Sequence, residues 1–263
     1  MARRSFGTRR RHVGAAIGSL MVAAGGVVVT VAPAGPAAAA PDCQATPGPS
    51  ANLRGCDLAD RDLADLDLSR AKLVHADLDG ADLIGTNLTN ADAIGATLVG
   101  AKLNKADLDR ANLTTATLTG ATLTGAQFEH ARLEHAVLGG VVISGTTFVH
   151  ANLIGASLSA ATSPSTGPGP LFADAVMKSV DLSHAVLPGA NFDGTNLDSS
   201  SLAGATLTQA SLYKTKLVSA DLDGANLTDT SLVHANLSGI ERAGTIWTGA
   251  TCPDGAAAMA SGC

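Results

Sequence analysis

The chain has 263 residues, of which 46% are hydrophobic but only 3% aromatic, so its interior is expected to consist of Ala and Leu rather than of bulky side chains. Five of its 17 basic residues lie in the first eleven positions and no acidic residue precedes Asp42, which leaves 12 basic and 23 acidic residues after residue 40, a net charge of −11. That balance favours solubility and disfavours binding to nucleic acid or to anionic membranes.

The first forty residues have the pattern of a secretory signal peptide. Arginines between residues 3 and 11 precede a Gly- and Ala-rich apolar stretch over 12–31, followed by prolines and a run of alanines. The small residues at the end of this segment favour cleavage after Ala39. The sequence Arg3-Arg4-Ser5-Phe6 resembles the twin-arginine export signal. We therefore expect a secreted protein with no membrane span in its mature form. An uncleaved anchor over 13–32 is the alternative.

A five-residue repeat dominates the rest of the chain. An apolar residue, usually leucine, occupies every fifth position from Leu53 to Leu158 and again from Phe172 to Leu237, with one alanine among them. The residue two places before this central position is usually alanine. Residues 159–171 separate the two runs and are rich in Ser, Thr, Gly and Pro. This composition predicts a surface loop that bulges from one continuous solenoid.

A period of five fits neither an α-helix nor one continuous strand. Five residues advance the direction of a helix by about 140°, so the leucines would not form a stripe. On a strand, an odd period sends successive leucines to opposite faces. Within one repeat, however, alanine and leucine are two residues apart. A short extended segment can therefore point both inward while the other three residues turn a corner.

The repeats Ala-Asp-Leu-Asp-Gly (76–80 and 220–224) and Ala-Asn-Leu-Ile-Gly (151–155) resemble the pentapeptide-repeat family, and the likeness extends over about residues 51–254. This resemblance implies an all-β fold, the right-handed quadrilateral β-helix, with twenty residues per coil. The chain then has about ten coils and one loop interruption. Residues twenty apart stack in such a fold, which places Phe128 over Phe148 and Phe172 over Phe192 in a close-packed core.

The leader pattern, the two repeat runs, the composition of the segment between them and the implied rod together predict the domain organisation. The expected segments are a signal peptide (1–40), an N-terminal cap segment (41–52), a first repeat run (53–158), the loop (159–171), a second repeat run (172–247) and a disulfide-closed C-terminal cap (248–263). Arg242 at a central position is expected to mark where the regular coil fails. Trp247 is expected to pack over the open end.

The four cysteines lie near the two ends of the implied rod. The sequence alone allows three pairings. A rod of about ten coils is about 45 Å long at about 4.8 Å per coil, which keeps cysteines at opposite ends beyond disulfide reach. The implied rod therefore predicts the disulfides Cys43–Cys56 and Cys252–Cys263, which suit an oxidising exterior. Free cysteines in a reducing cytoplasm are the alternative.

Histidines form the group that most resembles a binding site. On the implied β-helix, His130 and His150 stack on adjacent coils and His135 lies one side along, so all three are candidate metal ligands. The alternative is that they are polar corner residues facing water. Acidic residues gather near the N-terminal end, where Asp57 lies over Asp77. A cation site and a solvated surface are both open interpretations of that cluster.

No motif identifies a reaction. The chain lacks a Gly-x-Ser-x-Gly elbow, a phosphate-binding loop, a His-Glu-x-x-His sequence and a zinc-spaced Cys/His set, and a filled solenoid offers no deep pocket. We therefore expect no enzyme and no cofactor. The expected function is a secreted scaffold whose polar surface binds an unknown extracellular or cell-envelope protein and no nucleic acid. The sequence does not indicate an oligomeric state.

Two other functions are alternatives to the scaffold. Some proteins of the family are acidic rods that mimic DNA and bind a topoisomerase (gyrase), and the net charge of −11 favours that interpretation while the export signal opposes it. A cation- or metal-binding surface, built from the histidine or aspartate columns, is the second alternative.

Overall fold

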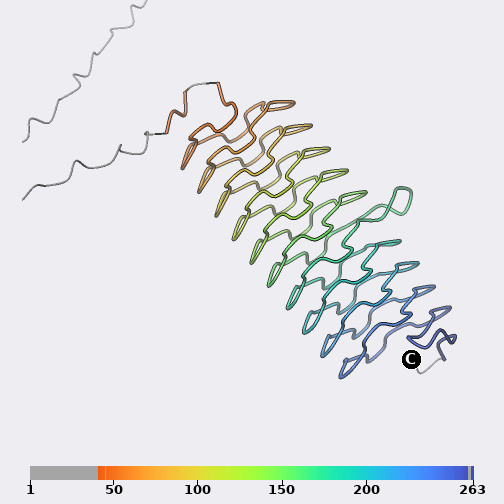
Figure 1. Cartoon of the computed structure of the whole chain (residues 1–263). Coiled ribbons are helices and arrows are strands. Elements are labelled where there is room, and N and C mark those ends of the chain that lie inside the picture. Colours follow the sequence, from red (N-terminus) through yellow and green to blue (C-terminus); the bar gives the residue numbers. More distant parts are fainter. Residues whose placement is uncertain (1–40, 45, 260–261) are drawn as a thin grey trace, which may run out of the picture. The chain divides into compact units, whose positions relative to one another are not determined.

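The computed structural model describes residues 41–44, 46–259 and 262–263, which belong to one compact unit, Ala39–Cys263. The predicted signal peptide (1–40), its cleavage site and its arginine motif lie outside the described residues. The described chain winds into a β-helix whose successive coils lie side by side along one axis (Figure 1). Among the described residues, no helix is long and apolar enough to cross a membrane.

Each coil has four sides, and each side pairs with the same side of the next coil. The pairing is a parallel bridge between two single residues twenty positions apart, so no side contains an extended strand. We number the faces by their first bridges, which are Asn52↔Lys72 (first), Asp57↔Asp77 (second), Asp62↔Asp82 (third) and Asp67↔Asn87 (fourth). Their last parallel bridges are Lys216↔Asn236, Asp221↔Glu241, Asn226↔Ile246 and Ser231↔Thr251. Four five-residue repeats therefore make one coil.

The repeat around Leu58 shows the backbone path that the other repeats share. The N–H of Leu58 donates to the carbonyl of Asp77 on the next coil at 2.7 Å, and the N–H of Arg61 donates back to Leu58 at 3.3 Å, which closes a turn. Asp60, the second residue inside this turn, has φ of 55°. A positive φ at that position is typical of a type II turn. Because Gly, Asn, Asp and His adopt it most readily, they are favoured at the last position of the repeat.

Central leucines and inward alanines fill the core along all four faces. Four fully buried phenylalanines interrupt the leucines of the fourth face, and they form one continuous stack. Phe128 lies on Phe148 with ring centroids 4.9 Å apart, and Phe172 lies on Phe192 at 4.8 Å, as the twenty-residue spacing led us to expect. The stack also contains a contact that we did not predict, between Phe148 and Phe172 at 5.1 Å. Each such pair adds about 0.5–1.5 kcal/mol beyond the burial of its rings.

Threonine or serine replaces the inward alanine at several positions, and its hydroxyl is paired there. Thr86 Oγ1 donates to the carbonyl of Leu63, one coil earlier, at 2.8 Å, and Thr146 donates to Leu123 at 2.7 Å. The same bond is made by Thr195, Ser200, Thr215 and Thr230. Because a carbonyl of the preceding coil is within reach at each of these positions, the hydroxyls enter the core without an unsatisfied donor.

An insertion of four residues in one coil produces the break between the two repeat runs. The bridge Val142↔Thr162 joins residues twenty apart, but the next bridge, Thr147↔Leu171, joins residues 24 apart. The next three bridges also join residues 24 apart, and they are Asn152↔Val176, Ser157↔Asp181 and Thr162↔Val186. From Leu171↔Asn191 onward the spacing is twenty again. The β-helix therefore continues in register on both sides of the insertion.

The inserted residues are Pro164–Gly167, fewer than the predicted loop 159–171. Ala161 and Ser163 still face the core and are buried. The chain rejoins the coil at Pro168, whose carbonyl accepts hydrogen bonds from the Gly145 N–H at 2.8 Å and from Ser144 Oγ at 3.3 Å. The Ser/Thr/Gly/Pro composition suggested a longer loop because small polar residues also fill regular turn and core positions here.

The regular coil extends beyond Arg242 to Thr251, further than the predicted end of the second run. Arg242 occupies a central position but is exposed, because no complete coil follows it. Trp247 occupies the next central position and is 4% exposed. A Cβ added to Gly262 would lie 2.9 Å from its indole, so the C-terminal segment covers Trp247 closely. Trp247 is thus a core residue of the last coil rather than a lid over the open end.

Candidate functional site

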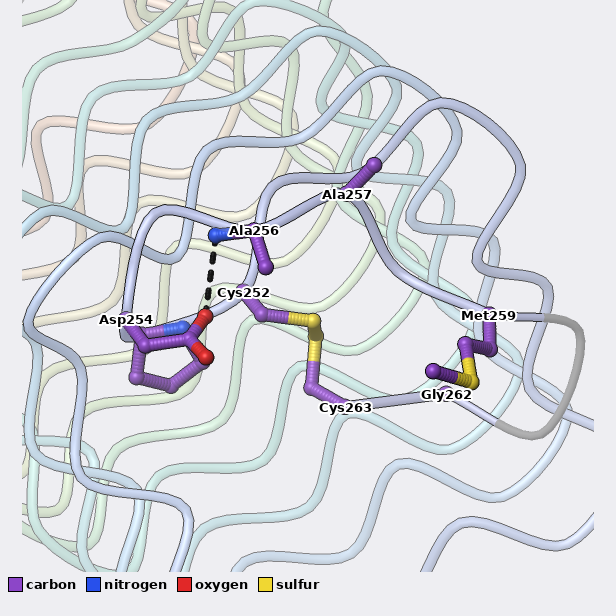
Figure 2. A pocket seen from close by; sticks show the side chains of 8 residues that line it. Cys252, Asp254, Ala256, Ala257, Met259, Gly262 and Cys263 are labelled. Carbon is purple, nitrogen blue, oxygen red and sulfur yellow. Dashed lines mark hydrogen bonds between the residues drawn. A yellow bond between two sulfur atoms is a disulfide. The ribbon is translucent and has the colours of Figure 1, made fainter.

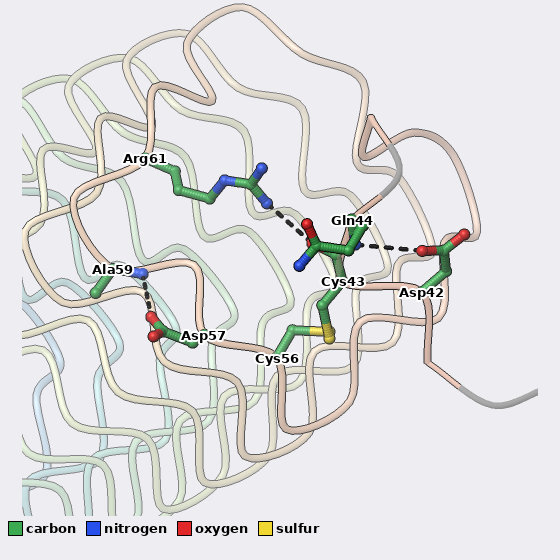
Figure 3. The surroundings of a disulfide bond; sticks show 7 residues. All are labelled: Asp42, Cys43, Gln44, Cys56, Asp57, Ala59 and Arg61. Atoms are coloured by element: carbon green, nitrogen blue, oxygen red, sulfur yellow. Dashed lines mark hydrogen bonds between the residues drawn. A yellow bond between two sulfur atoms is a disulfide. The ribbon is translucent and has the colours of Figure 1, made fainter. Parts of the chain in front are cut away.

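The N-terminal end is held by a disulfide and a hydrogen bond. Cys43 is joined to Cys56 with a Cα–Cα distance of 5.4 Å (Figure 3). Cys56 is 1% exposed and occupies an inward position that alanine fills in most repeats. Arg61 Nη1 donates to the carbonyl of Cys43 at 3.3 Å. Together these contacts hold residues 41–44 against the first coil.

The C-terminal end carries the second disulfide, Cys252–Cys263, also with a Cα–Cα distance of 5.4 Å (Figure 2). Thr251 pairs antiparallel with Ala257, and Asp254 Oδ1 accepts the Ala256 N–H at 2.9 Å. This pairing of the four cysteines is consistent with the two local disulfides expected from the rod.

An open hollow of about 460 Å³ lies beside the C-terminal disulfide (Figure 2). Its lining residues are Cys252, Pro253, Asp254, Ala256, Ala257, Met259, Gly262 and Cys263. Asp254 is the one ionisable side chain among them, and both cysteines are oxidised. The described residues that line the hollow therefore offer neither a nucleophile nor the acid–base pair that general acid–base catalysis requires.

Six histidines of the described chain share one backbone position, the second residue of the turn, with φ between 55° and 61°. They are His75, His130, His135, His150, His184 and His234. Histidine is enriched in this left-handed conformation, so the turn accounts for their recurrence without a ligand.

The structure brings together two of the three candidate histidine ligands. The rings of His130 and His150 stack with centroids 5.0 Å apart and planes 15° from parallel. His135 lies over Gly155 instead, where an added Cβ would be 2.6 Å from its Nδ1. Glycine at 155 thus makes room for the imidazole of the preceding coil. These histidines do not form a three-ligand group in the described part of the chain.

A different group in the described chain has three ligand atoms close enough for one metal ion. Carboxylate oxygens of Asp221, Asp223 and Glu241 lie within 4.8 Å of one another. Asp221 and Glu241 are bridged on the second face, and Asp223 Oδ1 accepts the N–H of Ala243 at 2.6 Å. Such oxygens are ligands for hard cations, but these also serve as acceptors for the backbone. Our sequence analysis missed this group, although the spacing of twenty between Asp221 and Glu241 was a visible signal.

Local donors and cations relieve the acidic columns near the N-terminal end. Asp57 Oδ1 accepts the Ala59 N–H at 3.2 Å, so the stacked Asp57 and Asp77 are each engaged by their own turns. Lys102 Nζ lies 3.4 Å from Asp82 Oδ2 on the third face. The backbone N–H and the hydroxyl of Ser69 hold the pKa of Asp67 below its ordinary value. The cluster is therefore a hydrogen-bonded surface.

Asp109 is perturbed in the opposite direction. Partial burial raises its pKa, and the charges of Asp107 and Glu129 add to this effect. The Glu129 N–H, which donates to Asp109 Oδ1 at 2.8 Å, opposes it. Aspartates at the first turn position thus act as acceptors for the next coil, as Asp79 does for the Val99 N–H at 2.8 Å.

Comparisons with known proteins agree on one family. The family model for pentapeptide repeats matches residues 51–90, 81–120, 121–159, 175–213 and 207–240. Among solved structures, HetL from the cyanobacterium Nostoc sp., a pentapeptide repeat protein involved in heterocyst differentiation regulation, is 33% identical. The match covers 78% of this chain and 91% of that chain, with a TM-score of 0.67. No curated protein matches the chain.

Two further solved structures are more distant. QnrB1, a plasmid-mediated fluoroquinolone resistance protein, is 16% identical over 70% of this chain and 90% of its own, with a TM-score of 0.32. A pentapeptide repeat protein from the Arabidopsis thaliana thylakoid lumen is 29% identical over 39% of this chain and 68% of its own, with a TM-score of 0.21.

Proposed function

The chain belongs to the pentapeptide-repeat family, whose fold is the right-handed quadrilateral β-helix, and we propose that it is an exported, non-enzymatic scaffold of about ten coils that binds an extracellular or cell-envelope protein. The observation that supports this is the filled interior. Leucine, alanine and phenylalanine occupy it from the first coil to the last, so a partner must bind side chains on the outside of the molecule. Regular spacing of these side chains suits an extended protein surface.

Two features support export and the absence of catalysis. The leader pattern over residues 1–40 is that of a signal peptide, and cysteine pairs close both ends of the described chain, a combination suited to an oxidising compartment. Pentapeptide-repeat proteins are generally structural rather than enzymatic. The described residues that line the open hollow beside Cys252 include no acid–base pair.

The DNA-mimic alternative is less well supported by the surface. A mimic of the phosphate backbone needs a continuous acidic surface, but the bridged positions of the four faces do not form one. On the second face Thr97 follows Asp57 and Asp77, and on the fourth face Asn87 follows Asp67. Lys72 follows Asn52 on the first face, and Lys102 follows Asp82 on the third. Arg54 also pairs with Asp92 at 3.3 Å. A cation-binding surface rests on Asp221, Asp223 and Glu241, whose oxygens are partly used by the backbone.

Four exposed apolar residues in neighbouring coils allow a direct test, because each lies on a different face. Val176 is on the first face, Val137 on the second, Val186 on the third and Leu171 on the fourth, and all are 38–42% exposed. A photo-crosslinking amino acid at each position, introduced into the full-length protein in its own cells, would sample all four faces without disturbing the core.

We expect one or two adjacent positions to capture the same protein outside the cytoplasm, while the remaining positions capture nothing. Capture of a cytoplasmic topoisomerase would contradict the proposed scaffold function and support the DNA-mimic alternative. Recovery of the chain only from the cytoplasm would remove the export part of the proposal. Equal weak labelling from all four faces would show that no face is a specific binding surface.

A further inference from the structure

The inserted residues Pro164–Gly167 form a small protrusion with a firmly packed base. Figure 1 shows this loop standing out beyond the outline of the neighbouring coils. At its base, the Pro168 carbonyl is bonded to Ser144 and Gly145. Gly169 packs so closely on the backbone of Gly189 that a side chain there would overlap it. The tip, Ser165 and Thr166, is exposed.

The backbone of this tip is free, which distinguishes it from the serines and threonines of the coils. Neither the N–H nor the C=O of Ser165 or Thr166 takes part in a backbone hydrogen bond with any described residue, whereas the exposed Thr162 is bridged to both neighbouring coils. An enzyme that modifies a hydroxyl must draw several residues of its substrate into an extended groove. A residue that is bridged to the neighbouring coils cannot enter such a groove without breaking the β-helix, but the residues at the tip of an exposed loop can. Thr46 is also outside the ladder, but it lies against the first coil beside Arg61 and Leu63.

Ser165 faces a second feature, a polar hollow of about 280 Å³ on the solenoid beneath the loop. Its other lining residues are Gly167, Gly169, Pro188, Gly189, Thr208, Gln209 and Asp229. The hollow is slightly smaller than the roughly 300–1,000 Å³ of typical ligand pockets, so it suits one small ring. Gln209 and Asp229 supply donors and acceptors for hydroxyl groups, and Pro188 supplies an apolar surface. Thr166 does not line this hollow.

We propose that Ser165 is a site of O-linked glycosylation and that the first sugar of the glycan lies in this hollow. Proline-flanked serine and threonine segments are typical acceptors of such glycans. In the transfer, Ser165 Oγ forms a bond to the anomeric carbon of a sugar activated as a phosphate ester. The bond from that carbon to the phosphate breaks, and the hydroxyl proton passes to a base of the transferase. The inference rests on the proposed export, because the modification belongs to a secreted scaffold.

The test is mass spectrometry of the full-length protein, purified separately from the medium and from the cells of its own host. Intact masses and proteolytic maps would be compared for the unaltered chain and for Ser165→Ala, Ser165→Thr and Thr166→Ala. Thr166→Ala is the matched control, because it removes a neighbouring hydroxyl on a residue that is also exposed but lies outside the hollow. Thermal unfolding of each variant would show that all four proteins are folded.

We expect sugar on the peptide that contains Ser165, complete loss of it in Ser165→Ala, and retention in Ser165→Thr and Thr166→Ala. An exported protein with no sugar, or with sugar on any other residue, would overturn the inference while leaving the proposed scaffold intact. A chain that stays in the cytoplasm but carries sugar on Ser165 would overturn the export and keep the site. An unmodified cytoplasmic chain would overturn both.

Discussion

Phe148 and Phe172 are 24 residues apart in the sequence, yet their rings lie 5.1 Å apart with planes only 4° from parallel. The protrusion Pro164–Gly167 takes four residues out of the coil without changing the register of the core. The two repeat runs therefore share one hydrophobic column, and the loop is an appendage to a single solenoid.

The phenylalanine stack should be a large local contribution to stability. Phe172→Ala removes a fully buried ring from the middle of the stack and leaves a cavity, for which we expect a loss of about 3–5 kcal/mol in the free energy of unfolding. Leu171→Ala is the adjacent control, because Leu171 is 42% exposed; its effect should stay within about 0.5 kcal/mol. Denaturant unfolding of both variants checks this, and equal losses would contradict the stack.

Removal of the protrusion should leave the β-helix intact. Deletion of Pro164–Gly167 restores the spacing of twenty and joins Ser163 directly to Pro168, whose carbonyl already bonds to Gly145 as a regular turn residue would. We expect an unfolding temperature equal to or above that of the unaltered chain, because a shorter loop loses less entropy on folding. A deletion of the same length within one repeat, for example Leu202–Ala205, is the control and should prevent cooperative folding. A protrusion deletion that unfolds like the control would contradict the single-solenoid architecture.

Removal of two buried hydroxyls, those of Ser163 and Thr146, should change the stability of the fold in opposite directions. Ser163 is 2% exposed and its Oγ has no hydrogen-bond partner among the described residues, so Ser163→Ala removes an unsatisfied polar group and should stabilise the fold by up to about 1 kcal/mol. Thr146 Oγ1 donates to Leu123 at 2.7 Å, so Thr146→Val should destabilise it by about 1 kcal/mol. Thermal unfolding monitored by circular dichroism measures both. A loss of stability in Ser163→Ala would show that its hydroxyl has a partner, such as a buried water.

Asp67 and Asp109 should contribute to the pH dependence of stability with opposite signs. The pKa of Asp67 is lowered in the folded state, so its stabilising contribution is present above the unfolded pKa and is lost as the pH falls through the folded pKa. The pKa of Asp109 is raised, so its charge opposes folding at neutral pH, and this effect disappears as the pH falls below the unfolded value.

Asp67→Asn should therefore lower stability at neutral pH. Asp109→Asn should raise it, because the side-chain carbonyl of the new amide carries no charge and can still accept the Glu129 N–H. Both differences should vanish in acid, below both pKa values. Denaturant unfolding at neutral and acid pH checks the signs, and a neutral-pH loss in Asp109→Asn would contradict the assigned cause.

The C-terminal disulfide should protect a short, local segment. Reduction of Cys252–Cys263 frees the end that pairs Thr251 with Ala257 and covers Trp247. We expect faster hydrogen exchange over residues 251–259 and higher accessibility of Trp247, with no change in the central coils. A Cys252→Ala/Cys263→Ala variant should reproduce the effect without a reductant. Non-reducing peptide mapping of the unaltered chain should find the two local disulfides, and a link between opposite ends would contradict the fold.

The sequence determined the coil. A leucine at every fifth position, with alanine two places earlier, predicted short extended segments separated by corners. The resemblance of these repeats to the pentapeptide-repeat family implied four sides per coil and the stacking of residues twenty apart. From that stacking and from the length of the rod, we predicted the phenylalanine pairs, the pairing of the cysteines and the contact of His130 with His150. These relationships were accessible because the repeat fixes the distance along the chain between any two residues on adjacent coils.

Two kinds of feature do not follow from the five-residue period, and only the tertiary structure decided them. They are the size of the insertion and the direction of the side chains at the corners. The Phe148–Phe172 contact requires the size of the insertion to be known, and composition overestimated it, because Ala161 and Ser163 look like loop residues but lie in the core. His135 lies one corner along from His130 and His150, as the period places it, and only the structure showed that its imidazole leans over Gly155. The period fixes where each Cα lies, whereas the direction of a side chain at a corner depends on the left-handed turn and on the residue one coil further on.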